Sequence, residues 1–222
     1  MSLHPITDLA GLHRHLQAAI QLEHATIPPY LTALYSIRPG TNSAAVQVLR
    51  AVAVEEMLHL TLSANILNAV GGAPDLTAPG FVPRFPAYLP DGETDFQVDL
   101  RRFSKEAIET FLKIERPAPA AADAARTVTR PPQPGMLKAG KVADDGAEHF
   151  YSIGEFYRAI EDGLIRLEAE HGPALFKGDP ARQVTPEFYY SGGGEIIAVT
   201  DLASARAAIR LIAEQGEGDG GA

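Results

Sequence analysis

The sequence predicts an all-α protein, a four-helix bundle with long irregular crossover segments. Four long stretches place apolar residues three and four positions apart, which is the period of an α-helix: residues 9–38, 43–70, 152–171 and 202–215. The segments between them are rich in proline, glycine and scattered charge and show no sustained period. A bundle is the architecture in which four such helices bury their apolar sides against one another.

The first predicted helix begins near Asp8, a residue type that caps helix N-termini, and stops before Pro39. Its apolar stripe consists of Leu9, Leu12, Leu16, Ile20, Ile27, Leu31 and Leu34. Pro28 and Pro29 lie inside it, and a proline in a helix interior costs about 3 kcal/mol or more. We therefore expect a kink or break in this helix one turn after Glu23.

The second predicted helix, Ser43 to Val70, is the most uniformly apolar, which predicts a central position in the bundle. The third ends at Gly172, and Asp201 caps the fourth. The connection between the second and third helices is expected to contain an irregular segment at 73–103 with a short strand at 96–100, a short helix at 104–115, and a mobile loop or lid at 118–148.

The composition of the chain disfavours several classes of protein. Its 222 residues suit one sizeable core, so we expect one domain over residues 1–218 and a flexible tail at 219–222. The formal net charge of -9, without a Lys/Arg-rich block, argues against nucleic acid and membrane partners. The sequence shows no membrane-spanning apolar stretch and no signal pattern, so we expect a cytoplasmic protein. Without cysteine, any metal must use oxygen and imidazole ligands.

Glu23 is the first candidate metal ligand. It lies on the apolar stripe of the first helix, where an unpaired carboxylate is costly to bury. The second helix repeats this anomaly, because Glu56 and His59 lie three residues apart among apolar neighbours. Successive helix residues are about 100° apart, so Glu56 and His59 share a face and can approach one point. Glu-x-x-His on one helix, with a glutamate on its partner, is half of a di-iron carboxylate arrangement.

The second half of such a site is predicted on the two later helices. Glu155 lies on a small-residue face of the third long helix, and Glu214 lies on a comparable face of the fourth. An antiparallel pairing of these helices would bring the two carboxylates level. Glu217 stands where a second Glu-x-x-His motif would have histidine, so it is a candidate oxygen ligand in that place. Imidazole with several carboxylates suits iron, here a di-iron site, with manganese or zinc as alternatives.

Each candidate also has a simpler interpretation that the sequence leaves open. Glu56 and His59 fit a hydrogen-bonded pair in the core. Glu155 fits an acid that favours the first turn of a helix, and Glu214 follows Arg210 at the spacing of a surface ion pair. The core is also expected to contain three aromatic residues that could take part in redox chemistry beside a metal: Tyr30, Tyr35 and Tyr157.

A family resemblance is carried by six runs of the chain: 21–31 (QLEHATIPPYL), 55–60 (EEMLHL), 65–72, 153–157, 176–178 and 212–218. Through them the chain resembles the ferritin-like family of iminophenyl-pyruvate dimer synthase domains. The enzymes that give this family its name couple two imine units in bisindole pigment biosynthesis. The resemblance covers nearly the whole chain and implies a ferritin-like bundle with a carboxylate metal site at Glu23, Glu56, His59, Glu155 and Glu214.

Three functional hypotheses follow from the motifs and the resemblance. The first is a metal-dependent oxidoreductase that acts on a small organic substrate, such as an amino-acid-derived imine. The second is a ferritin-like protein that binds metal without catalysis, and the third is a metal-free structural helper of a biosynthetic enzyme. The sequence leaves open the substrate, the metal, the choice between one ion and two, and the oligomeric state, including a homo-oligomer.

Overall fold

The computed structural model describes residues 4–90, 95–116, 150, 152–189 and 192–216. These residues contain five α-helices: α1 (Leu9–Ser36), α2 (Ser43–Ala69), α3 (Lys105–Ile114), α4 (Ile153–His171) and α5 (Leu202–Gly216). Short 3-10 turns follow α4 at Gly172–Leu175, Pro180–Arg182 and Pro186–Phe188. Within the described residues there is no strand, and the predicted all-α class is confirmed.

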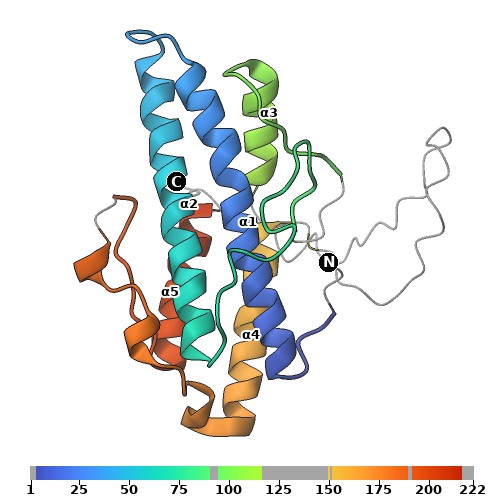
Figure 1. Cartoon of the computed structure of the whole chain (residues 1–222), viewed down its shortest axis with the longest axis vertical. Helices are drawn as coiled ribbons and strands as arrows, with labels where there is room; N and C mark the ends of the chain where they lie inside the picture. Colours follow the sequence, from blue (N-terminus) through green and yellow to red (C-terminus); the bar gives the residue numbers. More distant parts are fainter. Residues whose placement is uncertain (1–3, 91–94, 117–149, 151, 190–191, 217–222) are drawn as a thin grey trace, which may run out of the picture.

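The two longest helices, α1 and α2, form an antiparallel pair that runs the height of the molecule (Figure 1). α4 and α5 lie beside the lower part of this pair, and α3 lies beside its upper part (Figure 1). α4 packs against α1 and α5, and α5 also packs against α2. The bundle therefore consists of α1, α2, α4 and α5, and α3 is an additional short helix.

α1 begins where the sequence predicts, because Asp8 Oδ1 accepts a hydrogen bond of 2.6 Å from the backbone nitrogen of Gly11. It continues without interruption through Pro28 and Pro29 to Ser36, so the expected break does not occur. Most helical stability in proteins comes from tertiary packing, and α1 packs along α2 more extensively than any other pair of helices here. This packing compensates for the local cost of the two prolines.

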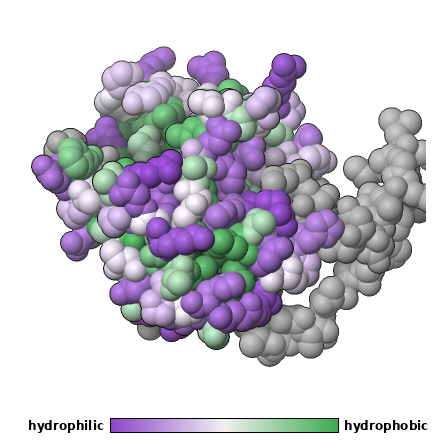
Figure 2. Space-filling view, turned by 60° about the horizontal axis from the view of Figure 1, so that its bottom comes forward, coloured by the Kyte–Doolittle hydropathy of each residue, from purple (hydrophilic) through white to green (hydrophobic). Residues whose placement is uncertain are grey.

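Fully buried side chains from all four bundle helices form one hydrophobic core, for example Leu16, Leu62, Phe156 and Ile212. Two of the three tyrosines predicted in the core are there, since Tyr30 is 1% exposed and Tyr157 is fully buried. Tyr35 is 81% exposed, so its predicted core position is wrong. On the face drawn in Figure 2, hydrophobic residues form small patches separated by hydrophilic ones. No helix in the described ranges is long and apolar enough to cross a membrane.

The connecting segments match the predictions in part. The short helix predicted at 104–115 is present as α3, with Ser104 Oγ accepting from the backbone nitrogen of Ala107. The strand predicted at 96–100 is reduced to a single bridge between Ala87 and Val98. The loop predicted at 118–148 and the tail at 219–222 lie outside the described residues, so these predictions and the domain boundary at residue 218 remain predictions.

The crossover between α4 and α5 is attached to α2 by buried amide side chains. Asn65 bonds both backbone groups of Val184, at 2.8 Å and 2.9 Å, and also donates to the carbonyl of Ile197. Gly178 passes so close to the end of α2 that its backbone nitrogen donates to Ala69 O at 2.9 Å. A Cβ atom on Gly178 would lie 1.7 Å from Asn68 O, so no larger residue fits there.

We expect Gly178→Ala to destabilise the fold, because the methyl group would force the crossover off the end of α2. Overpacking of this kind costs about 1–3 kcal/mol, and each kcal/mol lowers Tm by about 2–4 °C in a chain of this size. Thermal unfolding followed by circular dichroism measures the effect. Gly192→Ala is the matched control, since a Cβ there meets no atom within 4 Å. Equal Tm values for the two variants would contradict the close approach.

Candidate metal centre

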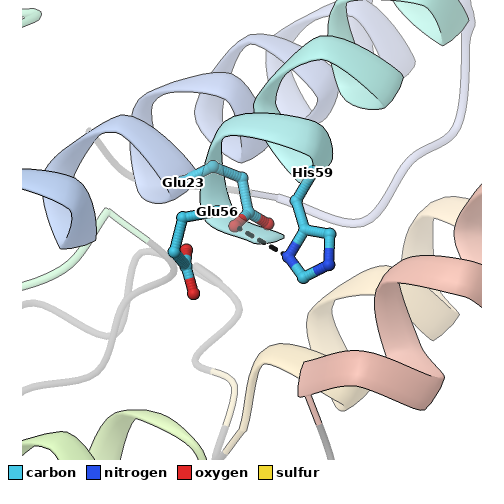
Figure 3. Close-up of side chains that lie close together, drawn as sticks. All are labelled: Glu23, Glu56 and His59. Carbon is cyan, nitrogen blue, oxygen red and sulfur yellow. Dashed lines mark ion pairs between the residues drawn. The ribbon is translucent and has the colours of Figure 1, made fainter. Parts of the chain in front are cut away.

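Three buried side chains meet halfway along the α1–α2 pair. Glu23 comes from α1 and is 1% exposed, while Glu56 and His59 come from α2 and are each 3% exposed. One oxygen or nitrogen atom of each residue lies within 4.8 Å of the corresponding atoms of the other two. Figure 3 shows the ends of the three side chains turned toward a common space. No second cluster of this kind is found in the described part of the chain.

The local helix geometry places these groups as the sequence predicts. Glu56 and His59 share one face of α2, because three residues correspond to nearly one turn. Glu23 follows the fully buried Ile20 by three residues, so it lies on the inward stripe of α1. The packing of α1 against α2 then brings these two faces together. The packing of α1 against α2 therefore brings Glu23 to the Glu-x-x-His motif of Glu56 and His59.

Glu23 is held on both sides by hydrogen-bonding groups. Its Oε1 accepts a hydrogen bond of 2.5 Å from the hydroxyl of Tyr157 on α4. The same hydroxyl lies 2.8 Å from Ser63 Oγ on α2, so the phenol is itself fixed. The other oxygen, Oε2, lies 3.6 Å from Nδ1 of His59, as marked in Figure 3. The orientation of Glu23 is therefore determined by three different residues on two helices.

Glu56 is oriented by Thr26, which lies on α1 one turn beyond Glu23. Thr26 Oγ1 lies 2.6 Å from Glu56 Oε2 and 2.7 Å from the carbonyl oxygen of Glu23. A hydroxyl has one proton, so it can donate to only one of these acceptors at a time. Protonation of Glu56 would satisfy both contacts, with Glu56 as donor to Thr26.

The electrostatics of the cluster favour binding of protons or a cation. Burial, reinforced by the charge of Glu23, raises the pKa of Glu56 well above its ordinary value. Burial disfavours the charged form of His59, but its hydrogen bond to Glu23 and the charge of Glu23 outweigh this, so its pKa is raised. Within the described residues, no Lys or Arg forms an ion pair with either glutamate. Among the described residues, the cluster therefore has no permanently charged positive partner.

Glu115 is a further acid of this region that the sequence analysis did not identify. It directly follows α3, and its Oε1 accepts a hydrogen bond from the hydroxyl of the buried Tyr30. Burial raises its pKa to about 7, and its charge interacts with Glu23 and His59. The signal was present, because Glu115 lies four residues after the buried Phe111 and shares its face of α3.

The structure does not bring Glu155 or Glu214 into the cluster. Glu155 is half-buried in the first turn of α4, and the residue of α4 that reaches Glu23 is Tyr157. Glu214 is exposed, and the adjacent Gln215 lies 2.8 Å from His59 instead. Neighbouring helix residues point about 100° apart, so only one of the two can face the bundle. Metal binding by any of the five predicted ligands remains a prediction, and Glu217 lies outside the described residues.

Without metal, we expect the protein to lose stability as the pH rises from about 5 to about 8. Folded Glu115 keeps its proton up to a pKa of about 7, whereas the unfolded residue releases it near the ordinary value of 4.5. Over that interval the unfolded state binds fewer protons, so increasing pH favours unfolding. The raised pKa of Glu56 acts in the same direction.

The measurement is Tm against pH in the presence of a chelator. Glu115→Gln should flatten the decline, because glutamine does not titrate. Glu109→Gln, at an exposed position of α3, is the matched control and should leave it unchanged. A Glu115→Gln profile identical to that of the wild type would show that Glu115 is not held protonated.

Comparisons with known proteins agree with this geometry. The profile of the Ferritin-like family matches residues 16–222. A solved structure of a ferritin-like protein from Caulobacter vibrioides is similar at a TM-score of 0.62 and 28% sequence identity, covering 96% of this chain and 70% of that one. No curated protein matches significantly. The buried Glu/His cluster lies between the longest helices of a bundle that resembles this solved structure. Since the family profile also matches most of its length, the chain belongs to the Ferritin-like family.

Proposed function

We propose that this protein is a metal-dependent oxidoreductase that acts on a small organic substrate, with iron held by Glu23, Glu56 and His59. The supporting observation is the convergence of two carboxylates and an imidazole within 4.8 Å in a bundle interior. Buried carboxylates without a cationic side chain are stabilised by protons or by a metal ion. Oxygen and imidazole donors suit iron or manganese, with zinc as an alternative.

The residues present fit such an ion. Three side-chain donors leave coordination positions of the ion open. The carboxylate of Glu115 is close enough to interact electrostatically with all three. Iron, when bound, would supply the one-electron and dioxygen chemistry that side chains lack. Metal analysis decides between one ion and two, and whether Glu155, Glu214 or Glu217 belongs to the ligand set. An amino-acid-derived imine is a candidate substrate because of the sequence resemblance alone.

The side chains around the cluster have separate roles in this proposal. Tyr157 and Thr26 fix the carboxylates of Glu23 and Glu56, so the donors need little reorganisation when a cation enters. Glu115, with a pKa of about 7, is suited to accept or donate a proton at neutral pH. Tyr30 holds this carboxyl through its hydroxyl. The burial of the cluster excludes bulk water, which strengthens each of these interactions.

One observation favours a different function. The raised pKa of Glu56 means that protons alone can neutralise the cluster, as a metal-free structural helper would require. A metal-binding protein without catalysis is intermediate between the two. Metal content separates the helper from the other two functions, and oxygen consumption separates the oxidoreductase from the metal-binding protein. A cytoplasmic location and a homo-oligomeric state remain predictions.

We expect protein purified without added metal to contain iron, manganese or zinc at about one equivalent or more, measured by elemental analysis. His59→Ala should lose most of this metal, because it removes the imidazole donor. His171→Ala, at an exposed position in the last turn of α4, is the matched control and should retain it. Glu214→Gln should also retain metal if the exposed position of Glu214 excludes it from the site. Metal-free wild type that also fails to bind added metal would favour the structural helper.

We expect reduced, iron-loaded protein to consume oxygen when a panel of aromatic imines and amino-acid-derived acids is supplied. Glu115→Gln should slow turnover by about 10²–10⁴-fold while retaining iron, if Glu115 transfers a proton as proposed. The measurement combines an oxygen electrode with iron content of the same samples. An iron-loaded wild type that is inactive across the panel would favour the binding protein without catalysis.

A further inference from the structure

Gln215 connects the candidate ligand His59 to a glycine run in the crossover between α4 and α5. It lies in the last turn of α5, and its Oε1 is 2.8 Å from Nε2 of His59. Its Nε2 donates a hydrogen bond to the carbonyl oxygen of Gly193. The glycine run, residues 192–194, is not followed by the Lys-Ser/Thr of a phosphate-binding loop.

These contacts determine which nitrogen of His59 carries a proton. A backbone carbonyl can only accept hydrogen bonds, so the amide group of Gln215 must turn its nitrogen toward Gly193. Its oxygen then faces His59 and can only accept, which places a hydrogen on Nε2 of the imidazole. In the neutral ring, the lone pair is therefore on Nδ1. This is the atom that lies 3.6 Å from Glu23 Oε2, on the side of the two carboxylates.

The glycine run is held against α2 by close backbone contacts. Gly193 has φ +86°, and a Cβ there would lie 3.3 Å from the backbone nitrogen of Glu55. Gly194 has φ +142°, and a Cβ there would lie 2.8 Å from Leu58 Cδ2. Both the left-handed backbone conformation and the lack of space favour glycine. The acceptor for Gln215 is thus fixed to the same turn of α2 that carries Glu56 and His59.

We propose that Gln215, anchored by Gly193, is a positioning residue that keeps the neutral ring of His59 in the Nε2–H tautomer and presents Nδ1 to the cation. The presentation of Nδ1 to a cation rests on the proposed function. The contacts of Gln215 with His59 and Gly193 do not depend on it. The other ring nitrogen of a metal-binding histidine usually donates to a carboxylate, carbonyl or water, which sets tautomer and ring orientation. In this chain an amide performs that role. Because Gln215 faces His59, the adjacent Glu214 points about 100° away from the cluster.

The first test is the nitrogen NMR spectrum of His59 in metal-free protein, at a pH high enough to deprotonate the imidazolium. The wild type should show a protonated Nε2 and an unprotonated Nδ1. Gln215→Leu should shift the tautomer ratio, because it removes the acceptor. Gln215→Glu should preserve the wild-type tautomer, because a carboxylate also accepts from Nε2–H. A wild-type spectrum with the proton on Nδ1 would overturn the proposal, whether or not the protein binds metal.

The second test is the Kd for Mn²⁺ by calorimetry, a readout independent of activity. Gln215→Leu should weaken binding about 10–100-fold, the usual effect of removing such a partner. Gly193→Ala should weaken it in the same direction, and Gly192→Ala, which meets no atom within 4 Å, is the matched control. Gln47→Leu, at an exposed position of α2, controls for loss of an amide.

The results also separate this inference from the proposed function. If the wild type binds Mn²⁺ and Gln215→Leu binds it with unchanged Kd and unchanged tautomer, the inference is wrong and the metal site stands. If the wild type has the Nε2–H tautomer but binds no metal, the positioning contact stands and the proposed function is wrong. If Gln215→Leu does not fold, the Gln215→Glu and wild-type spectra still decide the tautomer.

Discussion

The structure depends on the burial of two carboxylates side by side in an apolar helix pair. Glu23 and Glu56 have no cationic side chain bonded to them within the described residues, and both are almost fully buried. Their mutual repulsion and desolvation favour the uptake of protons or of a cation. Hydroxyl, amide and phenol groups around them hydrogen-bond Glu56, His59 and Glu23. This burial raises the pKa of Glu56 and makes the protonation of the bundle interior sensitive to its surroundings.

The later helices contribute differently from a symmetric carboxylate site. α4 provides the phenol of Tyr157, and α5 provides the amide of Gln215, both as hydrogen-bonding partners of the candidate ligands. The additional acid comes from outside the bundle, where Glu115 at the end of α3 is bonded to Tyr30. The site is consequently asymmetric, with its donors on α1 and α2 and its supporting groups on the other helices.

Periodicity and chemistry in the sequence were sufficient to predict the four bundle helices and the convergence of Glu23, Glu56 and His59. Helical spacing depends only on residues three and four apart, and a charged group on an apolar stripe is visible without coordinates. The cap at Asp8 was predictable for the same local reason. The proline pair does not break α1, because long-range packing of α1 on α2 outweighs its local cost. Tyr35 was misassigned because it lies about 100° around α1 from the buried Leu34 and points outward.

The sequence by itself determined the fold class and one half of the site, since both follow from short-range patterns on single helices. Only the tertiary structure decided that Gln215 rather than Glu214 faces His59, because the rotation of α5 about its axis is set by packing against α2 and α4. It also decided which groups Glu115 approaches, since its spacing from Phe111 indicates burial but not that it will lie near Tyr30, Glu23 and His59. Contacts between residues distant in sequence depend on how the helices pack, and that information is distributed over the whole core.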